Sequence, residues 1–413
     1  MKLFKMITAL ALAAAMVLSC VPAALADAEN VLLGYAKAIV IFEKHANGIF
    51  DNESIFSGRV LDNAGSDSSD WLAVGVSRLG LEEDYAAYYE AWEADIKERY
   101  ESSGGLDRAK ATEWHRAALT ALAMGADPTD IGGIDLIADG VYGRDENNSP
   151  DRQGLNGWIW SLIALDSLDW QTPEGALFDR EYIINKLLSA QLADGGFSVA
   201  ESPDAGDIDI TAMTLQALAP YTKDERVKRA ADKALDFLAE EIKGADDITC
   251  ESLAQTVCAL CCLGGDLTAE GRFDNSDDPL DKLMSFSRND GGFAHLMGDE
   301  KSSEVASAQT LIALAAVIRS SKGLRSIYDF GKEPQLTQNS PPVTLPQICQ
   351  SKSLNTGGKG YVYDVENGRE YIIKKSDGKK NAPHKGQLKR VRSTAAVITA
   401  AVGAVIAIRR KRA

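Results

Sequence analysis

One set of polar residues recurs at a fixed register of the chain. Each member stands eight residues before a short dipeptide, most often Ala-Leu, that marks successive segments of the body. The set comprises Asp70, Glu113, Asn156, Asp209 and Glu251, with Glu304 beside the sixth position. Carboxylates that converge on one place suit a cation, a sugar or acid–base chemistry. Acidic residues are also favoured in the first turns of helices, so a purely structural role stays open.

Large aromatic residues accompany these acids. Trp71, Trp114 and Trp158 follow the polar positions within two residues, His115 stands beside Trp114, and Trp160 comes one turn further on. Aromatic faces next to carboxylates are typical of sites for flat, cationic or sugar ligands. The alternative is that the indoles simply fill a core.

The elements that position these residues are predicted by the repeated dipeptide itself. It occurs at Ala121, Ala164, Ala217, Ala259 and Ala313, with Arg78-Leu79 as an imperfect sixth copy. A small residue stands three positions before each copy and an aliphatic residue two positions before. Small and apolar residues at this spacing predict helices that touch neighbours on more than one side. We therefore expect six inner helices.

More amphipathic segments lie between the inner helices and are expected to form an outer layer. Their ranges are about 30–45, 84–100, 132–140, 180–192, 225–242 and 278–288. Alternation of outer and inner helices predicts an all-α (α/α)6 toroid of about twelve helices over residues 27–330. The inner helices of such a toroid run parallel, so the six polar positions would meet at one mouth. No alternation typical of strands is seen in this region, which argues against a doubly wound sheet.

Three segments carry a resemblance to a known family. Residues 191–197 (QLADGGF), 207–213 (DIDITAM) and 251–255 (ESLAQ) resemble the prenyltransferase/squalene-cyclase repeat superfamily. The similarity is closest to secreted bacterial surface proteins that share the toroid with cobalamin-carrier proteins. The resemblance implies the toroid, but it implies no single activity, because the superfamily contains cyclases, transferases, thioester domains and binding proteins.

The catalytic motifs of the superfamily are only partly present or absent in this sequence. Cyclases of the superfamily use an Asp-x-Asp-Asp motif, and Ile210 replaces its third acid after Asp207 and Asp209. The zinc-binding and thioester motifs of other members are absent. Asp209 with Glu113 or Glu251 could still form the carboxylate pair of a carbohydrate-active enzyme. We expect no catalytic residue and no metal ligand, with an enzyme that uses the mouth acids as the alternative.

Three cysteines lie close together at Cys258, Cys261 and Cys262. With Cys250 or His295 they could hold a metal ion, but all three fall inside a predicted inner helix. Free cysteine is a common small residue of cores. A core role is the favoured interpretation.

The sequences at both ends of the chain predict that the protein is exported and attached to a membrane. Residues 1–26 read as a signal peptide with an A-x-A cleavage site, and a lipoprotein signal at Cys20 is the alternative. At the other end, residues 393–408 form an apolar run before the basic tail 409–413, which predicts a transmembrane anchor with a cytoplasmic tail. A Pro-rich linker, 331–348, and a basic stalk, 349–392, precede the anchor. Asn367-Gly368 in the stalk predicts a hairpin turn.

Composition narrows the function further. The formal net charge is −16, and 56 of the 60 acidic residues lie within residues 27–348. Such a body should repel nucleic acid. We expect an exported protein, held in a bacterial membrane with its body outside, whose toroid binds a small molecule, a glycan or a surface protein. The sequence does not identify a cofactor.

Overall fold

The computed structural model shows a helical body. The residues that it describes are 29–107, 109–199, 204–245, 247–264, 271–273 and 277–333, with the short segments 361–364 and 369–372. Up to residue 333, the described residues contain helices, turns and isolated bridges but no strand. The predicted all-α class is therefore confirmed for this part of the chain.

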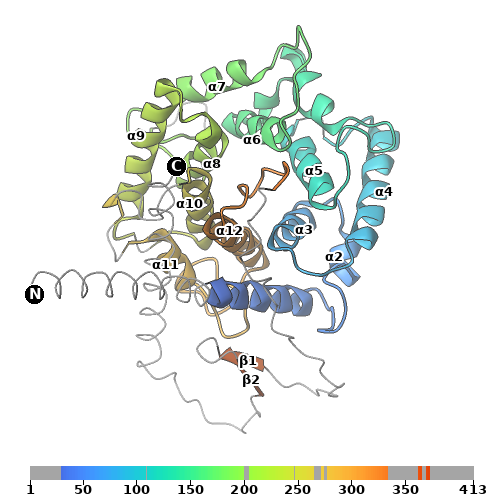
Figure 1. The fold of residues 1–413 in the computed structure, drawn as a ribbon, viewed down its shortest axis with the longest axis vertical. Coiled ribbons are helices and arrows are strands. Elements are labelled where there is room, and N and C mark those ends of the chain that lie inside the picture. Colours follow the sequence, from blue (N-terminus) through green and yellow to red (C-terminus); the bar gives the residue numbers. More distant parts are fainter. Residues whose placement is uncertain are drawn as a thin grey trace, which may run out of the picture.

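Six helices contact one another in cyclic order, and the last contacts the first (Figure 1). In that order they are α3 (Asp67–Leu79), α5 (Thr112–Ala123), α6 (Leu155–Asp166), α8 (Ile208–Leu218), α10 (Cys250–Cys262) and α12 (Glu304–Lys322). Each contains or ends at one copy of the repeated dipeptide. We refer to these six as the ring helices.

The ring helices run in the same direction, because equivalent ends meet. Near the C-terminal ends of α3 and α5, Ser77 Oγ donates to the Ala123 carbonyl at 2.6 Å. Arg319 Nη1 of α12 donates to the Arg78 carbonyl of α3 at 3.3 Å.

Equivalent ends also meet between other neighbours. Tyr221, just after α8, donates to Asp166 at the end of α6 at 2.8 Å. Ser252 near the start of α10 bonds Asp209 in the first turn of α8, and Gln255 of α10 bonds Gln309 at the same repeat position of α12. The N-terminal turns of all six therefore lie at one end of the ring.

Close packing explains the small residues of the repeat. The positions three before each dipeptide are fully enclosed, and a Cβ added at Gly75 would lie 3.2 Å from Leu311 of the neighbouring helix. The aliphatic residues one position later are also fully buried. Small side chains let adjacent helices approach, and the aliphatic side chains fill the space that remains.

Further helices and turns lie around the ring helices (Figure 1). Residues 29–46 are helical. The other outer helices are α2 (Gly58–Asp62), α4 (Tyr85–Ser103), α7 (Arg180–Ser189), α9 (Glu225–Ile242) and α11 (Pro279–Met284). Short turns complete the layer: the π-helix η1 (Ala138–Tyr142) and the 3-10 helices η2 (Glu146–Asn148), η3 (Pro150–Gln153) and η4 (Ala219–Tyr221).

Two predicted outer helices are wrong in extent. The first four residues of the predicted helix 132–140 are not helical, because Gly132 and Gly133 adopt left-handed φ values of 61° and 92°. Asp135 then caps the backbone N–H groups of Ile137 and Ala138, so helical structure begins only after it. The predicted helix 278–288 ends at Met284, where the chain turns into the next connection.

The two Asp-Gly-Gly-Phe turns have matching structures. Gly195 and Gly291 have φ values of 94° and 92°, which other residues rarely adopt, and Phe197 and Phe293 are fully buried. A Cβ at Gly195 would meet the Lys233 carbonyl of α9 at 2.5 Å. A Cβ at Gly291 would meet the Ala38 carbonyl at 2.8 Å. The helix at 29–46 therefore packs on the second turn as α9 packs on the first, which brings the N-terminal helix against the last repeat.

Several predicted segments lie outside the described residues. These are the signal peptide, the linker beyond residue 333, most of the stalk, the anchor and the tail. Within the stalk, β1 (Tyr361–Asp364) pairs antiparallel with β2 (Arg369–Ile372), on either side of the predicted hairpin turn. No helix in the described ranges is long and apolar enough to cross a membrane.

Candidate functional site

The six predicted polar positions all lie in the first turns of ring helices. Because the ring helices are parallel, these turns share one end of the ring, which we call the mouth. The side chains differ in exposure. Asp70 and Glu251 are buried, Glu113, Asn156 and Asp209 are half-buried, and Glu304 is exposed.

On the α3–α5 side, the mouth acids are neutralised. Arg116 Nε donates to Asp70 Oδ2 at 3.0 Å, and the same guanidinium holds both oxygens of Glu113 at 2.9 Å. Tyr88 donates to Asp70 Oδ1 at 2.8 Å, and Arg99 adds a further bond to Glu113. Every charge in this cluster has a partner, so its role is to join α3, α4 and α5.

The pKa values of Asp70 and Glu113 reflect both their burial and these contacts. Burial raises the pKa of Asp70 to about 6, although Arg116 and Tyr88 oppose the rise. Burial would also raise the pKa of Glu113, but its bonds to Arg116 and Arg99 outweigh that effect and lower it. Both acids are anchored by cations that face them, which leaves little room for a ligand's positive charge.

On the α8–α10 side, the acids lack such partners. Asp209 accepts a hydrogen bond from Ser252, while its Oδ1 is buried with no hydrogen-bond partner among the described residues. Burial, with Asp207 and Glu251 nearby, raises its pKa. Within the described ranges, no Lys or Arg nitrogen lies within 4.0 Å of the Asp209 or Glu251 carboxylate. Negative charge is therefore concentrated on this side of the mouth.

His295 completes this side of the mouth. Its Nδ1 lies 2.9 Å from Glu251 Oε2, and its carbonyl accepts the Cys250 N–H at 3.0 Å. The His295 side chain is 51% exposed. The backbone bond fixes the loop against the start of α10, so an accessible imidazole is held over a carboxylate. We call Asp209, Glu251 and His295 the mouth triplet.

The remaining polar positions lie beside the triplet without direct bonds to it. Asn156 has a buried Oδ1 with no partner among the described residues. Glu304 accepts from Asn47 Nδ2 at 3.3 Å and lies near Glu43, a carboxyl group that is only 2% exposed. Burial, with Glu304 next to it, raises the pKa of Glu43 to about 9.

Three of the predicted aromatic residues point away from the mouth acids. Trp114 donates to Tyr100 and stacks on Arg144, and Trp158 packs against both Phe178 and Tyr182. His115 is fully buried. The physical reason is the rotation of about 100° per residue around a helix, so a side chain one or two positions after a mouth residue faces an outer element.

His115 is held inside the body. Its Nε2 lies 3.0 Å from the Gly140 carbonyl and 3.2 Å from Ser161 Oγ. Burial lowers the pKa of His115 to about 3, so the imidazole is neutral at neutral pH. It joins α5 and α6 to η1 and does not reach the mouth acids.

Trp71 and Trp160 instead meet each other within the ring. Their ring centroids are 5.0 Å apart, and Tyr328, from the segment after α12, contacts both at 6.1 and 5.4 Å. The stack brings together α3, α6 and the chain beyond α12. It accounts for the two indoles as packing.

Sequence reasoning missed a chain of glutamines. Gln216 Nε2 donates to Gln255 Oε1 at 2.8 Å, and Gln255 Nε2 donates to Gln309 Oε1 at 3.2 Å. This polar chain links α8, α10 and α12. Gln255 and Gln309 each stand four residues before the repeated dipeptide, so the repeat register contained a signal for them.

The four cysteines in the described part of the chain, Cys250, Cys258, Cys261 and Cys262, lie in or beside the core. Cys250 and Cys258 are buried, and Cys250 Sγ lies 3.3 Å from Thr310 Oγ1. Burial raises the pKa of Cys250 to about 12, so it remains a thiol. Among the residues that the structure describes, the side chains of His, Cys, Asp and Glu do not form a group of three that could hold a metal ion.

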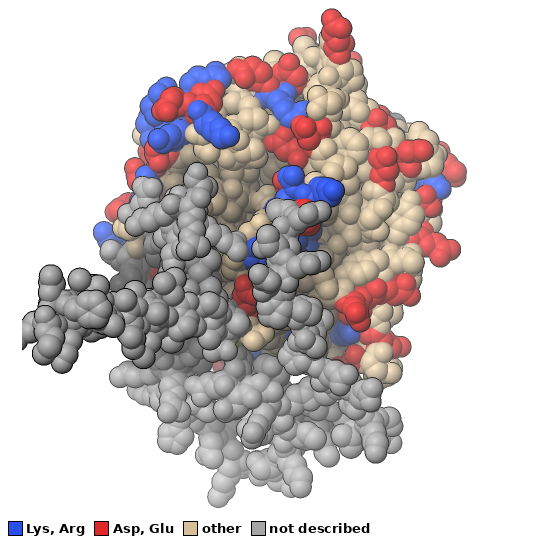
Figure 2. Space-filling model, viewed as in Figure 1, with Lys and Arg blue, Asp and Glu red and all other residues tan. Residues whose placement is uncertain are grey.

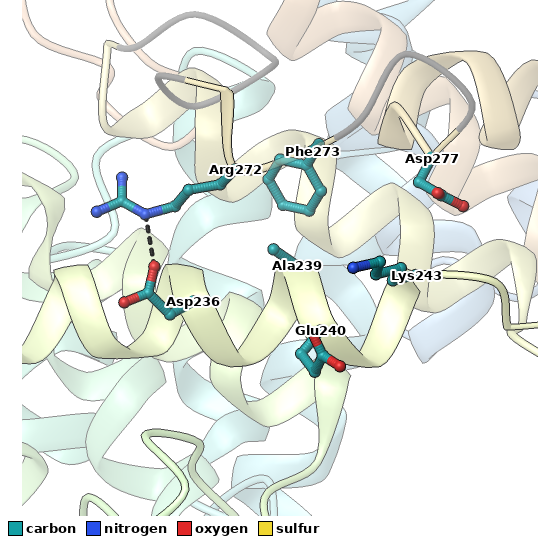
Figure 3. Close-up of a pocket in the computed structure, with 7 residues that line it drawn as sticks. All are labelled: Asp236, Ala239, Glu240, Lys243, Arg272, Phe273 and Asp277. Carbon is teal, nitrogen blue, oxygen red and sulfur yellow. Dashed lines mark hydrogen bonds and ion pairs between the residues drawn. The ribbon is translucent and has the colours of Figure 1, made fainter.

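Two surface hollows occur away from the mouth triplet. One, of about 300 Å³, lies between α9 and the side chains of Arg272, Phe273 and Asp277, where Arg272 pairs with Asp236 (Figure 3). The other lies beside Lys44 and is bordered by Asp51, Glu53 and Glu83. Both are lined by charged side chains, several of them already in ion pairs with each other, which does not single out a ligand.

No protein family, curated protein or solved structure matches the chain. The fold and the mouth therefore have to be interpreted from their own geometry.

Proposed function

We propose that the protein is a membrane-anchored bacterial surface protein whose (α/α)6 toroid, of the prenyltransferase/squalene-cyclase type, binds a ligand or partner without transforming it. The cyclic contacts of six parallel ring helices, with outer helices around them, support the toroid. The predicted signal peptide and C-terminal anchor support export and attachment. The acidic side chains spread over the surface (Figure 2) fit a body that avoids nucleic acid.

The mouth triplet is the observation that carries the binding proposal. Among the described residues, Asp209 and Glu251 have no Lys or Arg partner; Asp209 Oδ1 is a buried acceptor, and the accessible imidazole of His295 lies on Glu251. Such a group offers acceptors to hydroxyl groups and a negative field to a cation. We therefore propose a ligand that presents a positive charge or several hydroxyl groups, such as an organic cation, a glycan or a basic side chain of a surface protein.

Carbohydrate-active chemistry is the second candidate, and one observation favours it. Burial raises the pKa of Asp209 while Glu251 lies nearby, which is the pattern of a general acid beside a second carboxylate. Cyclase chemistry is less well supported, because Ile210 provides neither a charge nor a side-chain hydrogen bond to make Asp209 more acidic.

A thermal-shift screen of the purified body against glycans, cobalamins, organic cations and divalent ions tests the binding proposal. A ligand of the mouth should raise the melting temperature of the wild-type protein and lose most of that effect in Glu251→Gln. Glu300→Gln, which changes an exposed acid in the loop that carries His295, is the matched control. An effect that persists in Glu251→Gln would place the ligand elsewhere.

Attachment to the membrane has its own test. Deletion of 393–413 should release the body into the medium if the C-terminal run is the anchor. Full retention after this deletion would point to lipidation at Cys20, and Cys20→Ala in the same background would then release the protein.

A further inference from the structure

The end of the ring opposite the mouth is crossed by the chain itself. Residues 324–333, which we call the closing segment, follow α12 and appear in orange within the outline of the ring in Figure 1. Arg78 Nη2 donates to the Ser326 and Asp329 carbonyls at 2.9 and 2.8 Å, and the Phe330 N–H donates to the Ser167 carbonyl at 2.7 Å. The closing segment is thus tied to the C-terminal ends of α3 and α6.

Side chains of the closing segment also fill defined positions. Tyr328 makes edge contacts with both Trp71 and Trp160, and the Phe330 ring centroid lies 4.4 Å from the Arg78 guanidinium carbon. Ile327 is fully buried. The closing segment therefore contacts the ring as a bound peptide would, through aromatic and aliphatic side chains.

Two buried arginines face the closing segment from α3 and α12. The side chains of Arg78 and Arg319 are only 9% and 8% exposed. Arg78 Nε is buried with no hydrogen-bond partner among the described residues. Burial and the repulsion from Arg319 lower the pKa of Arg78 to about 10. Two like charges with so little water around them require an anion between them.

Glu333 supplies that anion. It pairs with Arg319 Nη2 through Oε1, which also lies 3.9 Å from Arg78 Nη2, and its Oε2 accepts the Arg325 N–H at 3.1 Å. Within the described ranges, it is the only carboxylate in ion-pair range of either buried arginine. Its own side chain is 40% exposed, so the site is open to solvent on the Glu333 side.

We propose that Arg78 and Arg319, with the Arg325 N–H, form a carboxylate-binding site at the C-terminal end of the ring, and that Glu333 is its built-in ligand. A carboxylate from outside the chain competes with Glu333 for this site, and its binding releases the end of the closing segment. The site is independent of the mouth triplet. Figure 2 shows basic side chains over the middle of this face, where an incoming anion would arrive.

Replacement of Glu333 by an external carboxylate would affect the part of the chain that follows it. The chain continues from Glu333 directly into the remainder of the Pro-rich stretch that joins the body to the stalk. Occupation of the arginine site by an external carboxylate would free this junction.

Chemical rescue of Glu333→Ala tests the proposal in the full chain. Removal of the side chain leaves a carboxylate-sized vacancy between the two arginines, so the melting temperature should fall. Acetate, added at constant ionic strength, should restore it in a saturable way, by about 2 °C at ten times the dissociation constant. The wild-type protein should respond several-fold less, because Glu333 already occupies the site.

Two controls keep the test decisive. Acetamide has the shape of acetate without its charge and should not restore Glu333→Ala, and acetate should have no specific effect on Arg319→Ala/Glu333→Ala. An equal response of Glu333→Ala to acetate and acetamide would overturn the proposal, as would an equal response of wild type and Glu333→Ala to acetate. The comparison with acetamide stands even if the double variant does not fold.

Discussion

Arg116 Nε lies 3.0 Å from Asp70 Oδ2, and this contact joins the first turn of α3 to α5. Both side chains are almost completely buried. The same guanidinium also holds Glu113, so one arginine neutralises two of the five acids at the mouth. The acids on the α3–α5 side of the mouth therefore have a structural role, whereas the mouth triplet lies on the α8–α10 side.

Removal of Arg116 should be strongly destabilising. Arg116→Met leaves the fully buried Asp70 carboxylate without its cation, and we expect a loss of about 3–5 kcal/mol in the free energy of unfolding. Asp70→Asn/Arg116→Met should recover part of that loss, because the uncompensated charge is then gone. Urea unfolding at pH 7 measures both. A loss below about 1 kcal/mol for the single variant would show that the pair does not join the helices.

Substitution of Glu43 should increase the stability of the folded protein. The folded protein holds this carboxyl group with a pKa raised to about 9, so stability is lost as pH rises from the unfolded value near 4.5 towards 9. Glu43→Gln removes this loss and should raise the free energy of unfolding by about 1–3 kcal/mol at pH 7. At pH 4, where the carboxyl group is protonated in both states, the two proteins should be nearly equal. A gain of the same size at both pH values would rule out the titration of Glu43 as the cause.

His115 should make the fold sensitive to acid. Its folded pKa is lowered to about 3, below the unfolded value near 6.5, so its contribution to stability is present above pH 6.5 and is lost as pH falls towards 3. His115→Gln keeps a side-chain N–H for the Gly140 carbonyl and cannot titrate. Melting temperatures recorded from pH 7 to pH 4 should fall less steeply for this variant. Parallel curves for the two proteins would contradict the assignment.

Gly157 should not tolerate alanine, although it lies inside a helix. Gly→Ala in a helix usually stabilises by up to about 1 kcal/mol. Here the added Cβ would lie 1.8 Å from the Pro150 carbonyl oxygen of η3. We expect Gly157→Ala to lower the melting temperature by several degrees through this overlap. Gly298→Ala, where no atom lies within 4 Å of the added Cβ, is the control and should change little.

The repeat register explains which parts of the fold could be predicted. The positions before each Ala-Leu copy must be small or aliphatic because neighbouring ring helices touch there, and Gly75 against Leu311 shows the contact directly. The start of the predicted helix 132–140 was wrong because Gly132 and Gly133 occupy left-handed backbone, which the apolar pattern of the segment does not reveal.

The site was only partly predictable for a different reason. The register places Asp209 and Glu251 correctly in first turns, but it does not reveal which acids face a cation. Arg116 and Glu113 are three residues apart and readable as a helix pair, whereas Arg116 meets Asp70 only through tertiary packing. His295 comes from a connecting loop, and its contact with Glu251 spans 44 residues.

The central claim is that the mouth triplet binds a ligand and does not transform it. Asp209→Asn keeps the shape of the side chain and removes both its charge and its titratable proton. The decisive measurement is equilibrium binding, with product analysis, of the best ligand from the thermal-shift screen to wild type and to Asp209→Asn. We predict unchanged ligand in both incubations and an affinity at least tenfold weaker for the variant. Consumption of the ligand by wild type that Asp209→Asn abolishes, while the variant stays folded, would contradict the account.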